Sequence, residues 1–93
     1  MALARVVSFD GVTQDRVEEI KQQISEGRPD EIPATEIVML YDAEAQKSIV
    51  ALFFDSEDDY QRADEALSAM PADETPGHRT SVGKYEVAVR ATG

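Results

Sequence analysis

The chain has 93 residues, of which 42% are hydrophobic, and this size predicts a single small domain that spans residues 1–93. Its 9 Lys and Arg residues against 19 Asp and Glu give a formal net charge of −10 at pH 7, which argues against nucleic acid and membrane surfaces as partners. Because the chain has no cysteine, a disulfide framework, a thiolate nucleophile and a cysteine-ligated metal are excluded.

The first predicted element is a strand at residues 3–9, whose alternating apolar side chains stop at an Asp-Gly turn pair. A helix is predicted next, because Thr13 is a suitable N-cap and apolar residues recur at helical spacing from Val17 onward. Gly27 supplies the C-terminal stop of this helix.

The most hydrophobic stretch, residues 34–55, reads as two strands joined by a polar turn near residues 42–45. Residues 49–54 are apolar at consecutive positions. Because neighbouring side chains of a strand point to opposite faces, this run places apolar groups on both faces of its sheet. Both faces of the sheet therefore need to be covered.

A second helix is predicted after Ser56, which begins a Ser-x-x-acid capping pattern and is followed by apolar residues at helical spacing. Pro71 ends this helix. Residues 71–80 are predicted to form a surface loop, because they combine proline, glycine and polar residues without periodicity. The last predicted strand covers residues 81–90.

The order strand, helix, strand, strand, helix, strand predicts an α+β, ferredoxin-like βαββαβ fold. Right-handed crossovers place both helices on one face of a four-stranded antiparallel sheet and leave the other face bare. Four exposed hairpin side chains would forfeit roughly 6 to 12 kcal/mol of burial, comparable with the whole stability of a small domain. The sequence therefore predicts that the bare face packs against a second copy in a homodimer.

The element order, the chain length and the doubly apolar hairpin together resemble the dimeric α+β barrel superfamily, which includes the antibiotic-biosynthesis monooxygenases. The resemblance covers residues 3–90 and is architectural, without a specific sequence motif. It implies a barrel between two protomers that binds, or oxidises without a cofactor, a small hydrophobic or aromatic molecule. Haem-degrading members use an Asn, Trp and His set, and this chain has neither Asn nor Trp. No haem and no other cofactor is therefore predicted.

Five side chains are the candidates for binding such a ligand: Arg5, Tyr41, Phe53, His78 and Glu86. His78 has an ordinary pKa near 6.5 and would serve as a general base at a pocket mouth, or else is a solvated loop histidine. The two aromatic residues line a pocket, or else belong to the core or the interface.

The charged candidates depend on how the last strand is oriented. If Tyr85, Val87 and Val89 face the helices, then Lys84, Glu86 and Arg90 point to the dimer side, where Arg5 would join them. These charges would form a polar patch for a carboxylate or phenolate ligand. The alternative is a set of ion pairs at the rim.

The sequence identifies no catalytic residue and no metal site. Asp55, Glu57 and Asp59 have the spacing that opens a calcium loop, but Tyr60 and Ala66 stand where the loop needs its glycine and its bidentate glutamate. These acidic residues instead suit the start of a helix. The common nucleotide-binding and hydrolase motifs are absent from the sequence.

Two functions stay open at this point: a ligand-binding or catalytic barrel, and a non-catalytic oligomerisation or regulatory module. A cavity with convergent polar groups favours the barrel function, whereas a sealed apolar interface favours the module. The N-terminal residues lack the apolar core of a signal peptide, and no apolar run reaches membrane-spanning length. A cytoplasmic location is therefore predicted.

Overall fold

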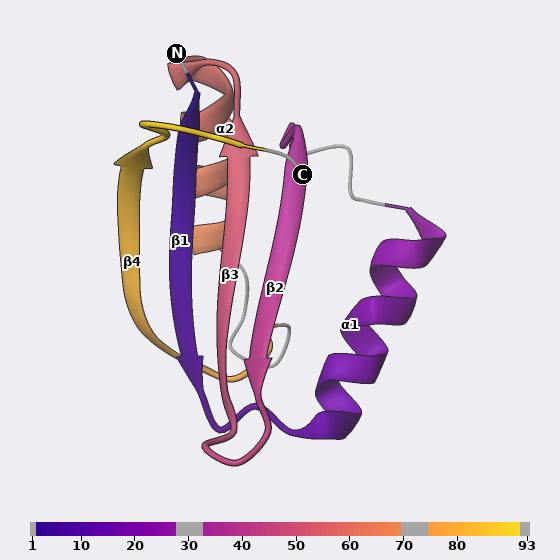
Figure 1. Ribbon diagram of the computed structural model, residues 1–93. Helices are drawn as coiled ribbons and strands as arrows, with labels where there is room; N and C mark the ends of the chain where they lie inside the picture. The colour runs from indigo at the N-terminus through magenta and orange to yellow at the C-terminus, as the bar shows by residue number, and fades with distance from the viewer. Residues whose placement is uncertain (1, 28–32, 70–74, 92–93) are drawn as a thin grey trace.

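The computed structural model describes residues 2–27, 33–69 and 75–91, and its elements follow the predicted order (Figure 1). The elements are β1 (Leu3–Asp10), α1 (Gln14–Glu26), β2 (Glu36–Asp42), β3 (Lys47–Phe54), α2 (Glu57–Ser68) and β4 (His78–Glu86). The four strands form one antiparallel sheet in the order β2-β3-β1-β4. This α+β, ferredoxin-like arrangement is the predicted fold.

Both helices begin where the sequence places their caps. The Thr13 hydroxyl accepts a hydrogen bond from the Arg16 N–H at 3.2 Å, and the Ser56 hydroxyl accepts one from the Asp59 N–H at 3.2 Å. The end of α1 is also as predicted, since Gly27 takes a positive φ of 127° that few other residues adopt.

The last strand is displaced from its predicted position. β4 begins at His78 and ends at Glu86, so residues 78–80 pair with β1 and do not belong to the predicted loop. The pairing shifts register between Ser8 and Phe9, and the strand begins with polar residues that carry no strand signal. Residues 70–74, which hold the predicted end of the second helix, lie outside the described residues.

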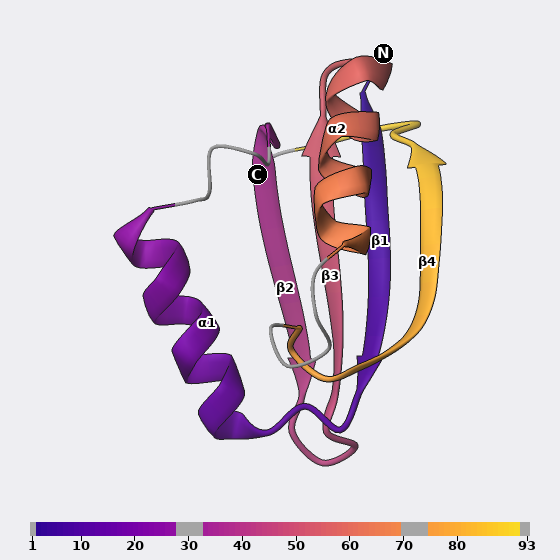
Figure 2. The ribbon, with the colours of Figure 1, turned by 180° about the vertical axis from the view of Figure 1, so that it is seen from behind.

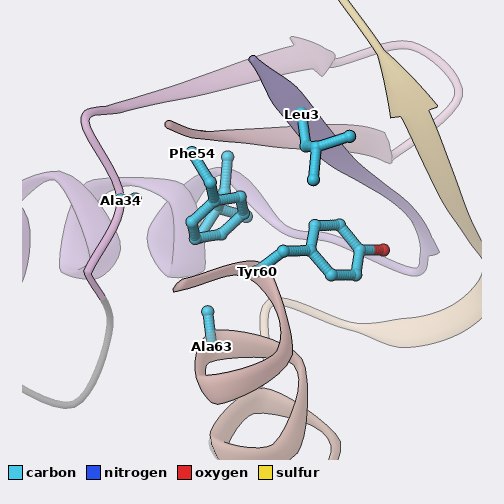
Figure 3. Close-up of a cluster of buried hydrophobic side chains, with 6 residues drawn as sticks. Leu3, Ala34, Phe54, Tyr60 and Ala63 are labelled. Carbon is cyan, nitrogen blue, oxygen red and sulfur yellow. The ribbon is translucent and has the colours of Figure 1, made fainter. Parts of the chain in front are cut away.

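The helical face of the sheet carries two hydrophobic clusters, and the first of them lies under α2. α2 lies across β1 and β3 on this face (Figure 2), and the Tyr60 ring meets Phe54 edge-on with centroids 5.5 Å apart. Figure 3 shows these two rings beside Leu3 and Ala63, with Ala34 at the margin. This cluster fixes α2 against the sheet.

The first helix covers less of this face than predicted. Near its start, Val17 packs into a second cluster with Val7, Phe9 and Val12. The rest of α1 lies beside β2 and away from the middle of the sheet (Figures 1 and 2). Ile24, near the end of the helix, remains 42% exposed. None of the helices in the described ranges is long and apolar enough to span a membrane.

The opposite side of the sheet, here called the open face, is covered by no helix (Figure 1). Residues 87–91 cross one end of it, where the Val87 N–H donates to the Ala2 carbonyl at 2.9 Å. Strand alternation and the pairing register place eleven uncharged positions along the middle of this face: Ala4, Val6, Ser8, Val38, Leu40, Ile49, Ala51, Phe53, Ser81, Gly83 and Tyr85. Four charged residues lie on the same face at the ends of the strands: Asp10, Glu36, Asp42 and Lys47.

Candidate functional site

The open face is the candidate functional site, because it gathers exposed apolar side chains on a rigid sheet. Leu40 and Tyr85 are each 59% exposed and Ile49 is 42% exposed. The eleven positions along the middle of the open face are uncharged, and its charged side chains stand at the ends of the strands. The chain as a whole has a net charge of −10, so an uncharged region of this size is unusual on its surface. Such a region is suited to contact another apolar surface.

Ion pairs border the open face at both ends. At the end next to the β2–β3 turn, the Lys47 ammonium lies 3.9 Å from the Asp10 carboxylate. At the other end, the Arg90 guanidinium lies 3.8 Å from the Glu36 carboxylate and 4.8 Å above the Phe53 ring. The charges form a polar rim around an apolar centre, which is the usual anatomy of a protein interface.

A depression of about 320 Å³ lies at the turn end of the hairpin and is lined by Leu40, Tyr41, Asp42, Lys47, Ser48 and Ile49. The polar groups that line this depression already have hydrogen-bond or ion-pair partners. One carboxylate oxygen of Asp42 accepts from two backbone N–H groups of the turn, and Lys47 faces Asp10. The depression therefore lacks the free convergent polar groups that a specific ligand site needs.

Arg5 lies on the helical face, so the predicted orientation of the last strand is wrong. The Arg5 side chain is 3% exposed, and its Nε donates to the Asp64 carboxylate of α2 at 2.9 Å. Its cross-strand neighbour Lys84 pairs with Glu57, also of α2. Tyr85, and not Lys84, points to the open face, because the carboxylates of α2 hold both cations on the helical side.

The Arg5 side chain remains incompletely paired. Among the buried side-chain nitrogen and oxygen atoms of the described residues, Nη2 of Arg5 has no hydrogen-bond partner. The Lys84 ammonium lies 4.9 Å from the Tyr60 ring centroid. Arg5 and Lys84 therefore contribute to the attachment of α2, while the predicted polar patch on the dimer side does not form.

The other candidate residues do not converge with Arg5. The Tyr41 hydroxyl donates to the Val12 carbonyl at 2.9 Å, which ties β2 to the segment before α1. Glu86 is exposed at the end of β4. Phe53 lies on the open face beside Ala4, whereas His78 pairs with Asp10 at the opposite end of the sheet. The five predicted ligand-binding residues thus occupy both faces and both ends of the sheet.

The acidic residues before and within α2 serve the helix. Ser56 caps the helix through Asp59, Glu57 pairs with Lys84, and the Asp59 carboxylate lies 3.8 Å from Arg62. Within the described residues, no group of three or more His, Asp or Glu side chains is arranged to hold a metal ion.

Sequence reasoning missed the small residues of the open face. Ser8, Ser81 and Gly83 lie next to one another on β1 and β4. The Tyr85 ring lies so close to Gly83 that a Cβ atom there would stand 2.6 Å from its Cε2 atom. The small residues at alternate positions 81 and 83 were visible in the sequence. The sequence did not indicate which face of the sheet they occupy, because that depends on how β4 pairs with β1.

The buried phenol of Tyr60 gives the stability a pH dependence at the alkaline end. Burial, followed by the nearby Asp64 carboxylate, raises the pKa of Tyr60 above its ordinary value of 10.0. Since the folded-state pKa is the higher one, this contribution to stability is complete below the unfolded-state pKa and is lost as pH rises through the folded-state pKa. We expect the free energy of unfolding, from urea titrations, to fall more steeply above about pH 10 in the wild type than in Tyr60→Phe. Parallel profiles for the two proteins would contradict this.

Comparisons with known proteins give no assignment for this surface. No protein-family model matches the sequence, and searches of curated proteins and of solved structures found no significant match.

Proposed function

We propose that this protein is a homodimeric module whose open face binds a second copy of the chain. The observation that carries the proposal is the group of exposed apolar side chains on the open face, with Leu40 and Tyr85 on the two edge strands and Ile49 on β3. The charged residues of this face stand only at the ends of the strands. Burial of such side chains stabilises a complex by about 25 cal/mol for each Å² of apolar surface removed from water. A second copy provides a matching apolar surface without any further partner.

The size of the open face suits a small dimer interface. Four strands spaced about 4.8 Å apart and six residues rising about 3.3 Å each give a projected area of roughly 400 Å² on each copy. Because side chains stand out of the sheet, the accessible area of each face is larger than its projected area. The total for the two copies approaches about 1,200 Å², which is the low end for specific protein interfaces. The module is thus proposed to be a dimer of modest affinity, in keeping with a dimeric α+β barrel.

The proposed function is tested by native mass spectrometry of freshly purified protein, together with light scattering after size exclusion. We expect twice the chain mass of 10.2 kDa and no additional bound molecule. Because a net charge of −10 on each copy opposes association, the dimer should become tighter as salt rises from about 20 to about 200 mM. A monomer at low micromolar concentration would contradict the proposal.

A second candidate function is the binding of a small hydrophobic or aromatic molecule between the two sheets. It is favoured by two aromatic side chains, Phe53 and Tyr85, which flank the small residue Ala4 in one row of the open face. The Tyr85 ring is 59% exposed and is suited to contact a flat apolar ligand. The Phe53 ring already has the Arg90 guanidinium above it, and Ala4 is buried. In the same mass spectra, a dimer that retains a small molecule would favour this function over the module without a ligand.

A further inference from the structure

Residues 87–91 follow β4 and lie across one end of the open face (Figure 1), and they are here called the strap. The Val87 N–H donates to the Ala2 carbonyl at 2.9 Å, which holds the start of the strap beside β1. Further along the strap, the Arg90 guanidinium lies 4.8 Å from the centroid of the Phe53 ring. The strap therefore covers the end of the open face at which Phe53 stands.

The strap takes the space that a second copy would need. Two sheets packed face to face lie about 10 Å apart, and the side chains of the two facing surfaces fill this distance. A chain segment that lies on one of these surfaces needs about 5 Å more, which is the usual spacing of neighbouring chains. In addition, the Arg90 guanidinium covers one side of the Phe53 ring, so a side chain of a second copy cannot reach that side. The strap and a second copy therefore exclude one another at this end of the open face.

We infer that the strap limits dimerisation, an inference that rests on the proposed dimer and adds a regulation of the same surface. The strap has to leave the Phe53 end of the open face before a second copy can pack there. When only a fraction of the free chains is competent to bind, the apparent affinity falls by that fraction. Both copies have to release the strap, so release in about one third of the free chains raises the dissociation constant of the dimer roughly ninefold.

The contacts of the strap are weak enough for a second copy to displace it. The Arg90 guanidinium lies 3.8 Å from the Glu36 carboxylate, and about half of each side chain is exposed. Exposed ion pairs and exposed cation–π contacts each stabilise a structure only slightly, while holding a chain segment in one conformation costs entropy. Val89 is 84% exposed, so this apolar side chain does not attach the strap to the sheet. The strap is therefore released at little cost.

Arg90→Ala is expected to tighten the dimer. The substitution removes the contacts of the strap with Phe53 and Glu36 and leaves the chain at its full length. If the strap is then released in about three quarters of the free chains instead of about one third, the dissociation constant of the dimer falls roughly fivefold. A concentration series in light scattering measures this constant, and circular dichroism checks that the fold is retained.

Arg62→Ala is the matched control. The Arg62 guanidinium also lies 3.8 Å from a carboxylate, that of Asp59, but it belongs to α2 on the other side of the sheet (Figure 2). Both substitutions remove one positive charge, so the repulsion between two copies changes equally. We expect Arg62→Ala not to tighten the dimer. An Arg90→Ala dimer no tighter than the Arg62→Ala dimer would overturn the inference and leave the proposed dimer intact. Monomers in the wild type and in both variants would overturn the inference together with the proposed function.

A spin label on the strap reports its release directly. The chain has no cysteine and Val89 is exposed, so Val89→Cys gives a single labelling site that disturbs few contacts. We expect the electron paramagnetic resonance line shape of this label to shift toward faster motion as the protein concentration rises and dimers form. When Val89→Cys is combined with Arg90→Ala, fast motion should dominate in dilute samples as well. Slower motion in the dimer would place the strap in the interface and overturn the inference, as would an unchanged line shape in a sample that light scattering shows to dimerise.

Discussion

Ile49→Asp is expected to convert the proposed dimer into a folded monomer. Ile49 is 42% exposed in the single chain, so the charged side chain can reach water there and the fold is retained. In the proposed dimer, the interface would bury two such carboxylates against an apolar surface. We expect dimer affinity to fall at least roughly a hundredfold, equivalent to about 2.7 kcal/mol. Light scattering measures the mass, and circular dichroism checks the fold.

Ile24→Asp is the matched control for this substitution. Ile24 on α1 has the same residue type and the same 42% exposure as Ile49, but it lies on a helix away from the open face. We expect the control variant to remain a dimer. Loss of the dimer in Ile24→Asp with retention in Ile49→Asp would identify the face of α1, and not the sheet, as the interface.

Phe54→Ala is expected to be the most destabilising single substitution. Phe54 is 0% exposed and its ring meets Tyr60 between the sheet and α2. Replacing a buried phenylalanine by alanine costs about 3 to 5 kcal/mol, which is a large part of the 5 to 15 kcal/mol that stabilises a typical domain. We expect Phe54→Ala to be largely unfolded or to melt far below the wild type.

The adjacent residue, Phe53, provides a control for the loss of stability in Phe54→Ala. Phe53 points to the open face, so Phe53→Ala should cost clearly less in the single chain and act mainly on dimerisation. Both substitutions are best measured by urea unfolding in the Ile49→Asp background, because dimerisation otherwise makes the apparent stability depend on concentration. Equal losses of stability for the two phenylalanines would contradict the assignment of faces in β3.

The features of the fold that depend on residues close together in the sequence were predictable from the sequence. The caps at Thr13 and Ser56 and the stop at Gly27 involve groups within a few residues, and each has the predicted role. The doubly apolar hairpin is likewise visible in its consecutive apolar residues. Its two faces become the core and the open face, as the alternation of a strand requires.

The placement of β4 and of the charged candidates was not predictable in this way. β4 has few apolar residues, and its register relative to β1 shifts between Ser8 and Phe9. Alternation alone leaves open which set of its side chains faces the helices, and Lys84 opposite Arg5 lies on the side predicted for Tyr85. The predicted polar patch depended on that assignment. The positions of Arg5 and Lys84 are determined by their ion pairs with α2, whose residues are distant from them in the sequence. Arg5 pairs with Asp64 and Lys84 with Glu57.

The pairing of two cations across the β1–β4 ladder has a consequence for how the protein folds. Arg5 and Lys84 are directly opposite one another, and like charges in that position destabilise a strand pair. The carboxylates of Asp64 and Glu57 remove this repulsion only when α2 is docked. We therefore expect the addition of β4 to the sheet edge and the docking of α2 to occur as one cooperative step, with neither stable before the other.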